Sequence, residues 1–140
     1  MKAVGLNGRE YNIDLKKYIV KCDDKTVKSK YHIAARELLS DMFSGYTILE
    51  EVKLPGSRDP SKKSALFLDF LIPNLSLAVE VHGRQHYEFV KFFHKTKAGF
   101  LTSKRRDDIK EQWCELNDIE LIVLNYEDKI EDWRKQIDCR

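Results

Sequence analysis

The stretch at residues 66–86, LFLDFLIPNLSLAVEVHGRQH, constrains the possible fold of this chain more than any other. It contains two apolar runs, 66–72 and 77–81, which are rich in the Leu, Val and Phe typical of buried strands. The intervening PNLS has turn-forming residues and the length of a common β-hairpin loop. We therefore expect two neighbouring antiparallel strands in the core of the protein.

Acidic residues interrupt the apolar pattern of this hairpin. If Ile72 pairs with Leu77, Asp69 lies opposite Glu80, and His82 shares their face because side chains alternate along a strand. The other face would then carry six apolar side chains: Leu68, Phe70, Ile72, Leu77, Val79 and Val81. Two facing carboxylates are costly unless a divalent cation such as Mg²⁺ or Mn²⁺ binds them. The alternative is a solvated face that simply carries acids, and three apolar neighbours on that face argue against it: Phe67, Leu71 and Ala78.

These residues resemble a known family. Asp69, a turn and then Glu-Val-His at 80–82 look like the core of the PD-(D/E)XK nucleases, with histidine where that pattern has lysine. VEVHGRQH at 79–86, together with DDIK at 107–110, is more specifically similar to the very short patch repair endonucleases. The EDxHD homing endonucleases and related small phage-type nucleases have a similar arrangement of motif residues. The likeness covers roughly residues 29–124.

The resemblance implies a metal-dependent DNA endonuclease with a restriction-endonuclease-like α/β core. The metal, Mg²⁺ or Mn²⁺, would be held by three groups: the carboxylates of Asp69 and Glu80 and the main-chain carbonyl of Val81. His82 or His86 would serve as general base or acid, although His86 matches its family position only with a one-residue gap. Asp107 would position a histidine or a second metal, and DNA would be the partner.

An amphipathic helix is predicted from Thr26 or Ser29 to about residue 43. Six residues at helical spacing would form its buried face: Tyr31, Ala34, Ala35, Leu38, Leu39 and Met42. The related nucleases carry a glutamate on this helix. At 100° per residue, His32 lies on the flank of the buried stripe and Glu37 nearly opposite, so both cannot reach the site. The spacing to the following Leu-Leu pair puts His32 at the glutamate position.

The net charge of +2 is unevenly distributed along the chain. Residues 89–106 contain six Lys or Arg and no acids, whereas residues 107–140 contain eleven acids and five bases. A basic stretch with interleaved aromatic residues suits a phosphate backbone, and a solvated loop and helix start is the alternative. The candidate DNA contacts are Arg84, Lys91, Lys95, Lys97, Lys104, Arg105 and Arg106.

The remaining segments predict one α/β domain over residues 1–140, a mixed sheet flanked by helices. Its parts are an N-terminal β-hairpin extension (1–25, with an Asn-Gly turn), a core (26–124) and a C-terminal helix (125–140). Further expected elements are a strand at 46–54, a helix at 104–116 capped by Ser103, a strand at 119–124 and a helix at 127–137. The inward residues of these two helices would be Ile109, Trp113, Leu116, Ile130, Trp133 and Ile137. Asp107 would lie in a first helical turn, where an acid is also favourable without any function.

Composition excludes some classes of protein. No apolar run approaches the length of a membrane span, and the N-terminus has no signal-peptide pattern. The three cysteines, Cys22, Cys114 and Cys139, have no disulfide or zinc-finger spacing, which favours free thiols in a reducing cytoplasm. Both a monomer and a homodimer remain open.

Two other functions remain open. One is a nucleic-acid-binding module that cleaves nothing, which would account for histidine at positions 82 and 32 in place of lysine and glutamate. The other is a zinc hydrolase that uses His82 and His86, four residues apart. The HExxH helix signature is absent and Gly83 breaks a helix, which disfavours the zinc hydrolase.

Overall fold

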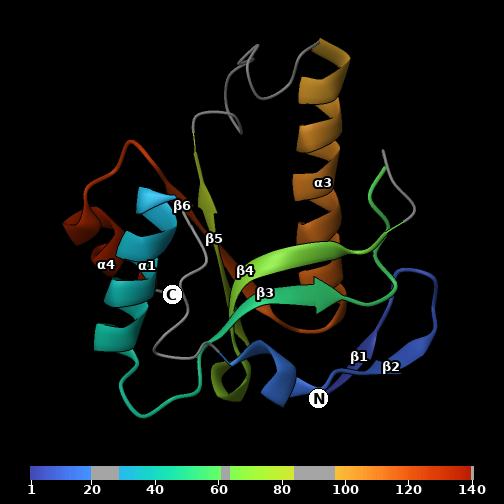
Figure 1. Ribbon diagram of the computed structural model, residues 1–140, viewed down its shortest axis with the longest axis horizontal. Coiled ribbons are helices and arrows are strands. Elements are labelled where there is room, and N and C mark those ends of the chain that lie inside the picture. The colour runs from blue at the N-terminus through green and yellow to red at the C-terminus, as the bar shows by residue number, and fades with distance from the viewer. Residues whose placement is uncertain (20–28, 61–63, 84–96, 140) are drawn as a thin grey trace.

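The computed structural model describes residues 1–19, 29–60, 64–83 and 97–139 (Figure 1). Its centre is a mixed four-stranded sheet of order β3-β4-β5-β6, in which only β5 and β6 are parallel. The strands are β3 (Leu49–Leu54), β4 (Leu66–Ile72), β5 (Leu77–His82) and β6 (Glu120–Asn125). A separate antiparallel hairpin, β1 (Lys2–Val4) and β2 (Glu10–Asn12), precedes them. The predicted α/β fold with an N-terminal hairpin is confirmed.

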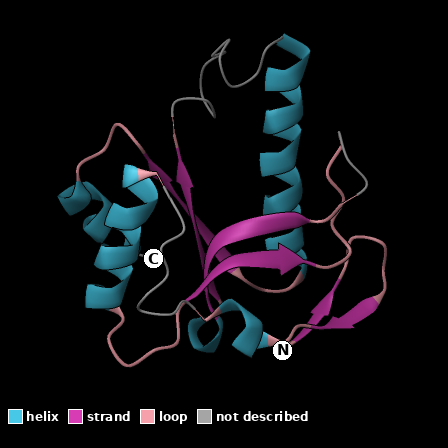
Figure 2. Ribbon diagram, in the orientation of Figure 1, coloured by secondary structure: helices cyan, strands magenta, loops and turns pink. Residues whose placement is uncertain are grey.

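Helices cover both faces of the sheet (Figure 2). Helices α1 (Lys30–Met42) and α4 (Ile130–Asp138) pack on one face, and α3 (Lys97–Leu116) packs on the other (Figure 1). Two short 3₁₀ turns, η1 (Leu15–Tyr18) and η2 (Pro73–Leu75), complete the described elements. Within the described ranges, no helix is long and apolar enough to cross a membrane.

Each face of the sheet has its own hydrophobic cluster. Trp133 and Ile137 of α4 join Leu39 of α1 over one face, whereas Trp113 and Cys114 of α3 lie under the other. Each fully buried Leu or Phe contributes about 1.5–3 kcal/mol of transfer free energy, so the two clusters hold the helices firmly on both faces of the sheet. Cys114 and Cys139 are free thiols, as predicted, while Cys22 lies outside the described residues.

The central hairpin has the predicted register. Phe70 pairs with Val79, Leu71 with Ala78 and Ile72 with Leu77. The PNLS segment makes this turn with a short 3₁₀ helix that ends at Ser76 in the left-handed conformation (φ 47°). Local turn chemistry therefore sets the pairing of the two strands, and it also sets which acids face each other.

The prediction of which face of the hairpin carries Leu68 is wrong. Leu68 was expected beside Phe70, but it packs in the α3 cluster, and Phe67 is 46% exposed. On the neighbouring strand, Glu51 adopts a left-handed conformation (φ 52°) at the position facing Asp69. The change of face in β4 thus coincides with a backbone outside the strand region at the paired position of β3.

The boundaries of two helices also differ from the prediction. Helix α3 already includes residue 97, so Ser103 is not its N-cap; the Ser103 hydroxyl donates to the Gly99 carbonyl one turn earlier (3.2 Å). Asp107 therefore lies in the middle of α3 and not in a first turn. Leu116 and Ile130 were expected to face inward, but they are 49% and 51% exposed because they lie at the ends of α3 and α4.

The N-terminal hairpin is attached to the far end of α3. Gly8 takes the positive φ (81°) that the Asn-Gly turn requires. The side chain of Asn117 accepts a hydrogen bond from the Val4 N–H (2.7 Å) and donates one to the Val4 carbonyl (2.9 Å). The hairpin is thereby held beside the sheet, close to the end of β3.

Candidate functional site

Asp69 and Glu80 face each other where β4 and β5 separate. The ladder pairing between these strands ends at Phe70 and Val79. Beyond it, the Asp69 N–H donates to Oε2 of Glu80 (3.1 Å), and the Val81 N–H donates to Oδ2 of Asp69 (2.8 Å). Each carboxylate thus accepts a backbone hydrogen bond from the opposite strand, which offsets part of the cost of burying two acids.

The electrostatics of this pair are strongly perturbed. Burial raises the pKa of Asp69 to about 7, and the neighbouring charge of Glu80 adds to the shift. Glu80 is only 2% exposed and forms an ion pair with Lys110 of α3, with Nζ 2.7 Å from Oε1. Burial disfavours the charge on Lys110, but the attraction of Glu80 outweighs it and raises the pKa of Lys110. Lys110 therefore stays charged and balances Glu80.

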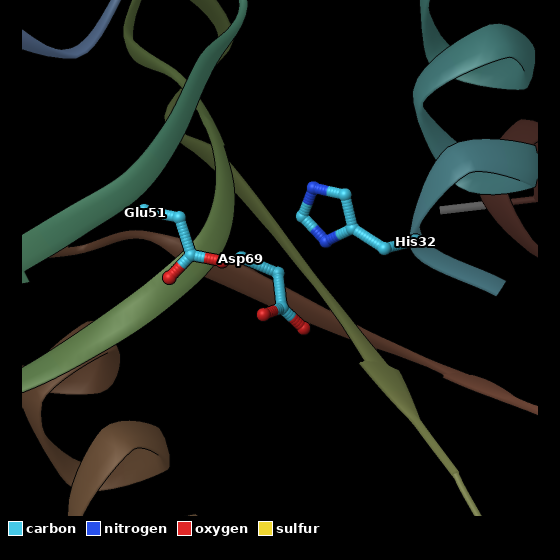
Figure 3. Close-up of side chains that lie close together, drawn as sticks. All are labelled: His32, Glu51 and Asp69. Atoms are coloured by element: carbon cyan, nitrogen blue, oxygen red, sulfur yellow. The ribbon is translucent and has the colours of Figure 1, made fainter. Parts of the chain in front are cut away.

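A cluster with the chemistry of a metal site lies on the α1 side of Asp69. His32 from α1, Glu51 from β3 and Asp69 from β4 each offer one donor atom, and these atoms lie within 4.8 Å of one another. Figure 3 shows the three side chains pointing toward one shared space between the helix and the two strands. The left-handed backbone at Glu51 accompanies this placement of its carboxylate beside Asp69.

The imidazole of His32 is held from two sides. Its Nε2 donates to Oε1 of Glu50 (2.6 Å), and its ring stacks on Phe70 with centroids 4.6 Å apart. Arg36 donates two hydrogen bonds, of 2.8 and 2.9 Å, to the same Glu50 carboxylate. Burial would raise the pKa of Glu50, but hydrogen bonds from His32 and Arg36 outweigh it and hold that pKa below its usual value.

This arrangement determines which ring nitrogen of His32 can bind a ligand. Because an ionised Glu50 accepts the Nε2 proton, the neutral ring carries its lone pair on Nδ1. In Figure 3, Nδ1 lies on the side of Asp69. A histidine that donates one N–H to a carboxylate and offers its other nitrogen is the usual form of a metal-ligating imidazole.

A second group of polar side chains faces α3. A cavity of about 140 Å³ is lined by Glu80 and His82 from β5 and by Asp107 and Lys110 from α3. His82 is 8% exposed, and its Nε2 lies 3.9 Å from Oδ1 of Asp107. The contact between Asp69 and Glu80 links this cavity to the His32 cluster, so the two groups form one continuous site on both sides of the open hairpin.

The structure divides the predicted site residues into these two groups. Asp69 and His32 lie together, and Glu80, His82 and Asp107 lie together. Glu37 is exposed, as the helical angles predicted, and His32, which was expected on the flank of the buried face, is buried. The contact recorded for Val81 uses its N–H, so metal binding by its carbonyl stays a prediction. Four predicted residues lie outside the described part of the chain: Arg84, His86, Lys91 and Lys95.

The sequence reasoning missed Glu50, Glu51, Arg36 and Lys110. Two consecutive acids in the strand LEEVKL were a usable indication, because alternation forces one of them toward the core. Arg36 follows His32 by four residues, and this spacing places both on one side of α1. Nothing local indicated Lys110, since its partner Glu80 is thirty positions away in sequence.

The basic residues of α3 have different environments. Arg106 forms an ion pair with Asp59 (2.9 Å), and Nζ of Lys104 lies 5.8 Å from the centroid of the Phe100 ring. Lys97 and Arg105 are exposed. The Asp59 contact gives Arg106 a structural role in holding the β3–β4 connection against α3.

A larger cleft lies between the N-terminal hairpin and the β3–β4 connection. Its volume is about 770 Å³, and Tyr11 and Tyr18 are among its lining residues. Among the described residues, its lining includes three bases, Lys17, Lys53 and Arg58, and one acid, Asp14. This cleft, which we call the basic cleft, begins two residues after Glu51 along β3.

Comparisons with known proteins give relatives of viral origin. Uncharacterized protein 033L of Invertebrate iridescent virus 3 is 31% identical over 108 residues, 77% of this chain and 55% of that protein. Uncharacterized protein 307L of Invertebrate iridescent virus 6 is 41% identical over 61 residues, 44% of this chain and 31% of that protein. Uncharacterized protein 094L of Frog virus 3 (isolate Goorha) is 37% identical over 78 residues, 55% of this chain and 50% of that protein. The chain thus spans about half or less of the length of these relatives. No protein-family model matches the chain, and no solved structure matches it.

Proposed function

We propose that this protein is a metal-dependent DNA endonuclease. The observation that carries the proposal is the position of Asp69, which lies beside His32 and Glu51 on one side and touches Glu80 on the other. Metal-dependent hydrolysis of phosphodiesters combines a cation site with a nearby proton-transferring group, and the residues of this hairpin could supply both. The resemblance of the 69–82 segment to the PD-(D/E)XK nucleases supports the same reaction class.

The donor set suits a divalent cation. Donor atoms about 2.1 Å from one cation lie roughly 3–4 Å apart, so side chains within 4.8 Å of one another need only small rotations to bind it. His32, Glu51 and Asp69 would hold the cation, which would supply Lewis-acid activation of the phosphate and of the attacking water. Binding of the cation would also weaken the electrostatic repulsion between the carboxylates of Asp69 and Glu80.

The group on the α3 side would move protons and balance charge. His82 lines the cavity beside Glu80 and would act as general base or acid, and the nearby carboxylate of Asp107 would stabilise its ring when it is protonated. Lys110 would supply a cation at the carboxylate pair. In the nuclease pattern a strand lysine has this charge, whereas this chain has His82 at that strand position and a lysine on the neighbouring helix.

Two basic surfaces would bind the phosphate backbone. The basic cleft contributes Lys17, Lys53 and Arg58 close to the end of β3, and α3 contributes the exposed Lys97 and Arg105. Clustered Lys and Arg side chains bind DNA by releasing counterions, independently of base sequence. The two surfaces would bind DNA on either side of the open hairpin.

The test is a cleavage assay on supercoiled, branched and mismatched DNA with Mg²⁺ or Mn²⁺ and with EDTA. We expect metal-dependent cleavage by the wild-type protein, loss of cleavage in Asp69→Asn and unchanged DNA affinity in that variant. Glu37→Gln is the matched control, because Glu37 is exposed on the opposite side of α1. Cleavage by Asp69→Asn at the wild-type rate would contradict the proposal.

A nucleic-acid-binding module without catalysis is the second candidate. The ion pair between Glu80 and Lys110 favours it, because a carboxylate already balanced by a lysine has less need of a cation. Such a module would bind DNA through the same basic surfaces. It would show no metal-dependent cleavage of any of the three DNA substrates in the same assay.

A further inference from the structure

The donors of the candidate cation site are not all oxygen. Mg²⁺ prefers oxygen ligands in near-ideal octahedral geometry, whereas imidazole nitrogen suits transition metals. Here two carboxylates, from Glu51 and Asp69, converge with one imidazole, from His32. The three ligands come from three different elements, α1, β3 and β4, so the packing of the fold brings this mixed set together.

The imidazole is prepared for ligation and not merely buried. His32 is 6% exposed, and the side-chain hydrogen bond that its ring makes in the described part of the chain uses Nε2. Stacking on Phe70 and the bond from Nε2 to Glu50 prevent the ring from turning away. Arg36 in turn holds Glu50 through two hydrogen bonds. A nitrogen lone pair that is fixed in orientation beside two carboxylates is the arrangement that a bound cation stabilises.

We propose that this centre selects a transition-metal dication, Mn²⁺ in the first place, over Mg²⁺, with Nδ1 of His32 as the selecting ligand. Glu50 and Arg36 are positioning residues, since they act on the cation only through the orientation and tautomer of His32. The inference rests on the metal-dependent function proposed above and names the metal. Mn²⁺ accepts both the imidazole and the two carboxylates, whereas Mg²⁺ gains little from the nitrogen.

The first test measures cation binding without DNA. We expect calorimetric titration to give at least roughly tenfold tighter binding of Mn²⁺ than of Mg²⁺ to the wild-type protein. His32→Asn replaces the ring by a smaller side chain with an oxygen near the Nδ1 position. This variant should bind Mn²⁺ about 10–100-fold more weakly and Mg²⁺ with nearly unchanged affinity. Thermal unfolding of each variant shows whether it remains folded.

The second test identifies the ligand directly and does not depend on affinity. Pulsed electron paramagnetic resonance of Mn²⁺ bound to the wild-type protein should show coupling to an imidazole ¹⁴N nucleus, and this coupling should be absent in His32→Asn. Glu50→Gln keeps an oxygen that can accept the Nε2 proton but removes the negative charge behind the imidazole, and it should lower Mn²⁺ affinity by about 10–100-fold while the nitrogen coupling remains. Glu37→Gln, on the exposed side of the same helix, should bind Mn²⁺ like the wild-type protein.

The outcomes separate this inference from the endonuclease proposal. Equal affinity for Mn²⁺ and Mg²⁺, or bound Mn²⁺ without nitrogen coupling, would overturn the inference even if the protein cleaves DNA. Unchanged Mn²⁺ affinity in Glu50→Gln would overturn the positioning role of Glu50. Nitrogen-coupled Mn²⁺ in a protein that cleaves none of the DNA substrates would support the inference and contradict the endonuclease proposal.

Discussion

Replacing Asp69 by Asn should change how the stability of the metal-free protein depends on pH. The pKa of Asp69 rises from 3.8 to about 7 in the folded state, because the carboxyl is buried and lies beside Glu80. Between about pH 4 and pH 7 the unfolded chain has released this proton and the folded protein retains it. The wild-type protein therefore loses stability as pH rises through this window, and the loss is complete above pH 7.

The size of the effect follows from the shift. A displacement of about three pKa units, at 1.36 kcal/mol each, corresponds to about 4 kcal/mol. This value is an upper limit, since Asp69 is partly exposed and some solvent screening remains. The asparagine of the variant does not titrate, and its amide oxygen can still accept a hydrogen bond from the Val81 N–H. The stability difference between Asp69→Asn and wild type should thus grow in favour of the variant by up to about 4 kcal/mol from pH 4 to pH 8.

The assay is urea unfolding in EDTA at a series of pH values between 4 and 8.5. Trp113 and Trp133 are buried on opposite faces of the sheet, so their fluorescence reports on both layers. Asp108→Asn is the matched control, because Asp108 is an exposed aspartate of α3. Parallel stability profiles for Asp69→Asn and wild type would refute the reasoning, since Asp69 would then titrate alike in the folded and unfolded states.

Three further predictions concern the surrounding residues. Lys110→Gln leaves a buried carboxylate without its cation and should lower the free energy of unfolding by about 3–5 kcal/mol in urea titrations at pH 7; unchanged stability would show that the ion pair contributes nothing. His82→Ala should reduce the single-turnover cleavage rate by ~10²–10⁴-fold with unchanged Mn²⁺ affinity, and wild-type cleavage would exclude His82 as the proton-transfer group. Replacing Lys53 and Arg58 together by Ala should weaken binding to all DNA sequences alike. The slope of the logarithm of the DNA-binding constant against the logarithm of the salt concentration should become less steep by roughly 1–2. Lys135→Ala, a substitution of an exposed residue of α4, should leave DNA affinity unaltered. If this variant lost as much DNA affinity as the variant of Lys53 and Arg58, the basic cleft would have no special role in binding.

Local patterns in the sequence determined several elements of this protein. Alternating apolar residues and the PNLS turn were enough to predict that Phe70 pairs with Val79 and that Asp69 faces Glu80. The 100° periodicity of α1 was enough to place His32 at the edge of the buried stripe and Glu37 on the exposed side. These features depend on neighbours within a few positions, so short-range sterics and hydrogen bonding encode them.

The tertiary structure alone decided which residues complete the site. Glu51 lies beside Asp69 on a left-handed backbone that no residue pattern indicated, and Leu68 packs on the face opposite to the expected one. Lys110 meets Glu80 because α3 packs against the sheet at one particular rotation and height. Such contacts join segments far apart in the chain, and the burial of whole helix and sheet faces sets their geometry. Periodicity can assign a residue to a face, but only the packed structure brings a particular side chain within reach of another.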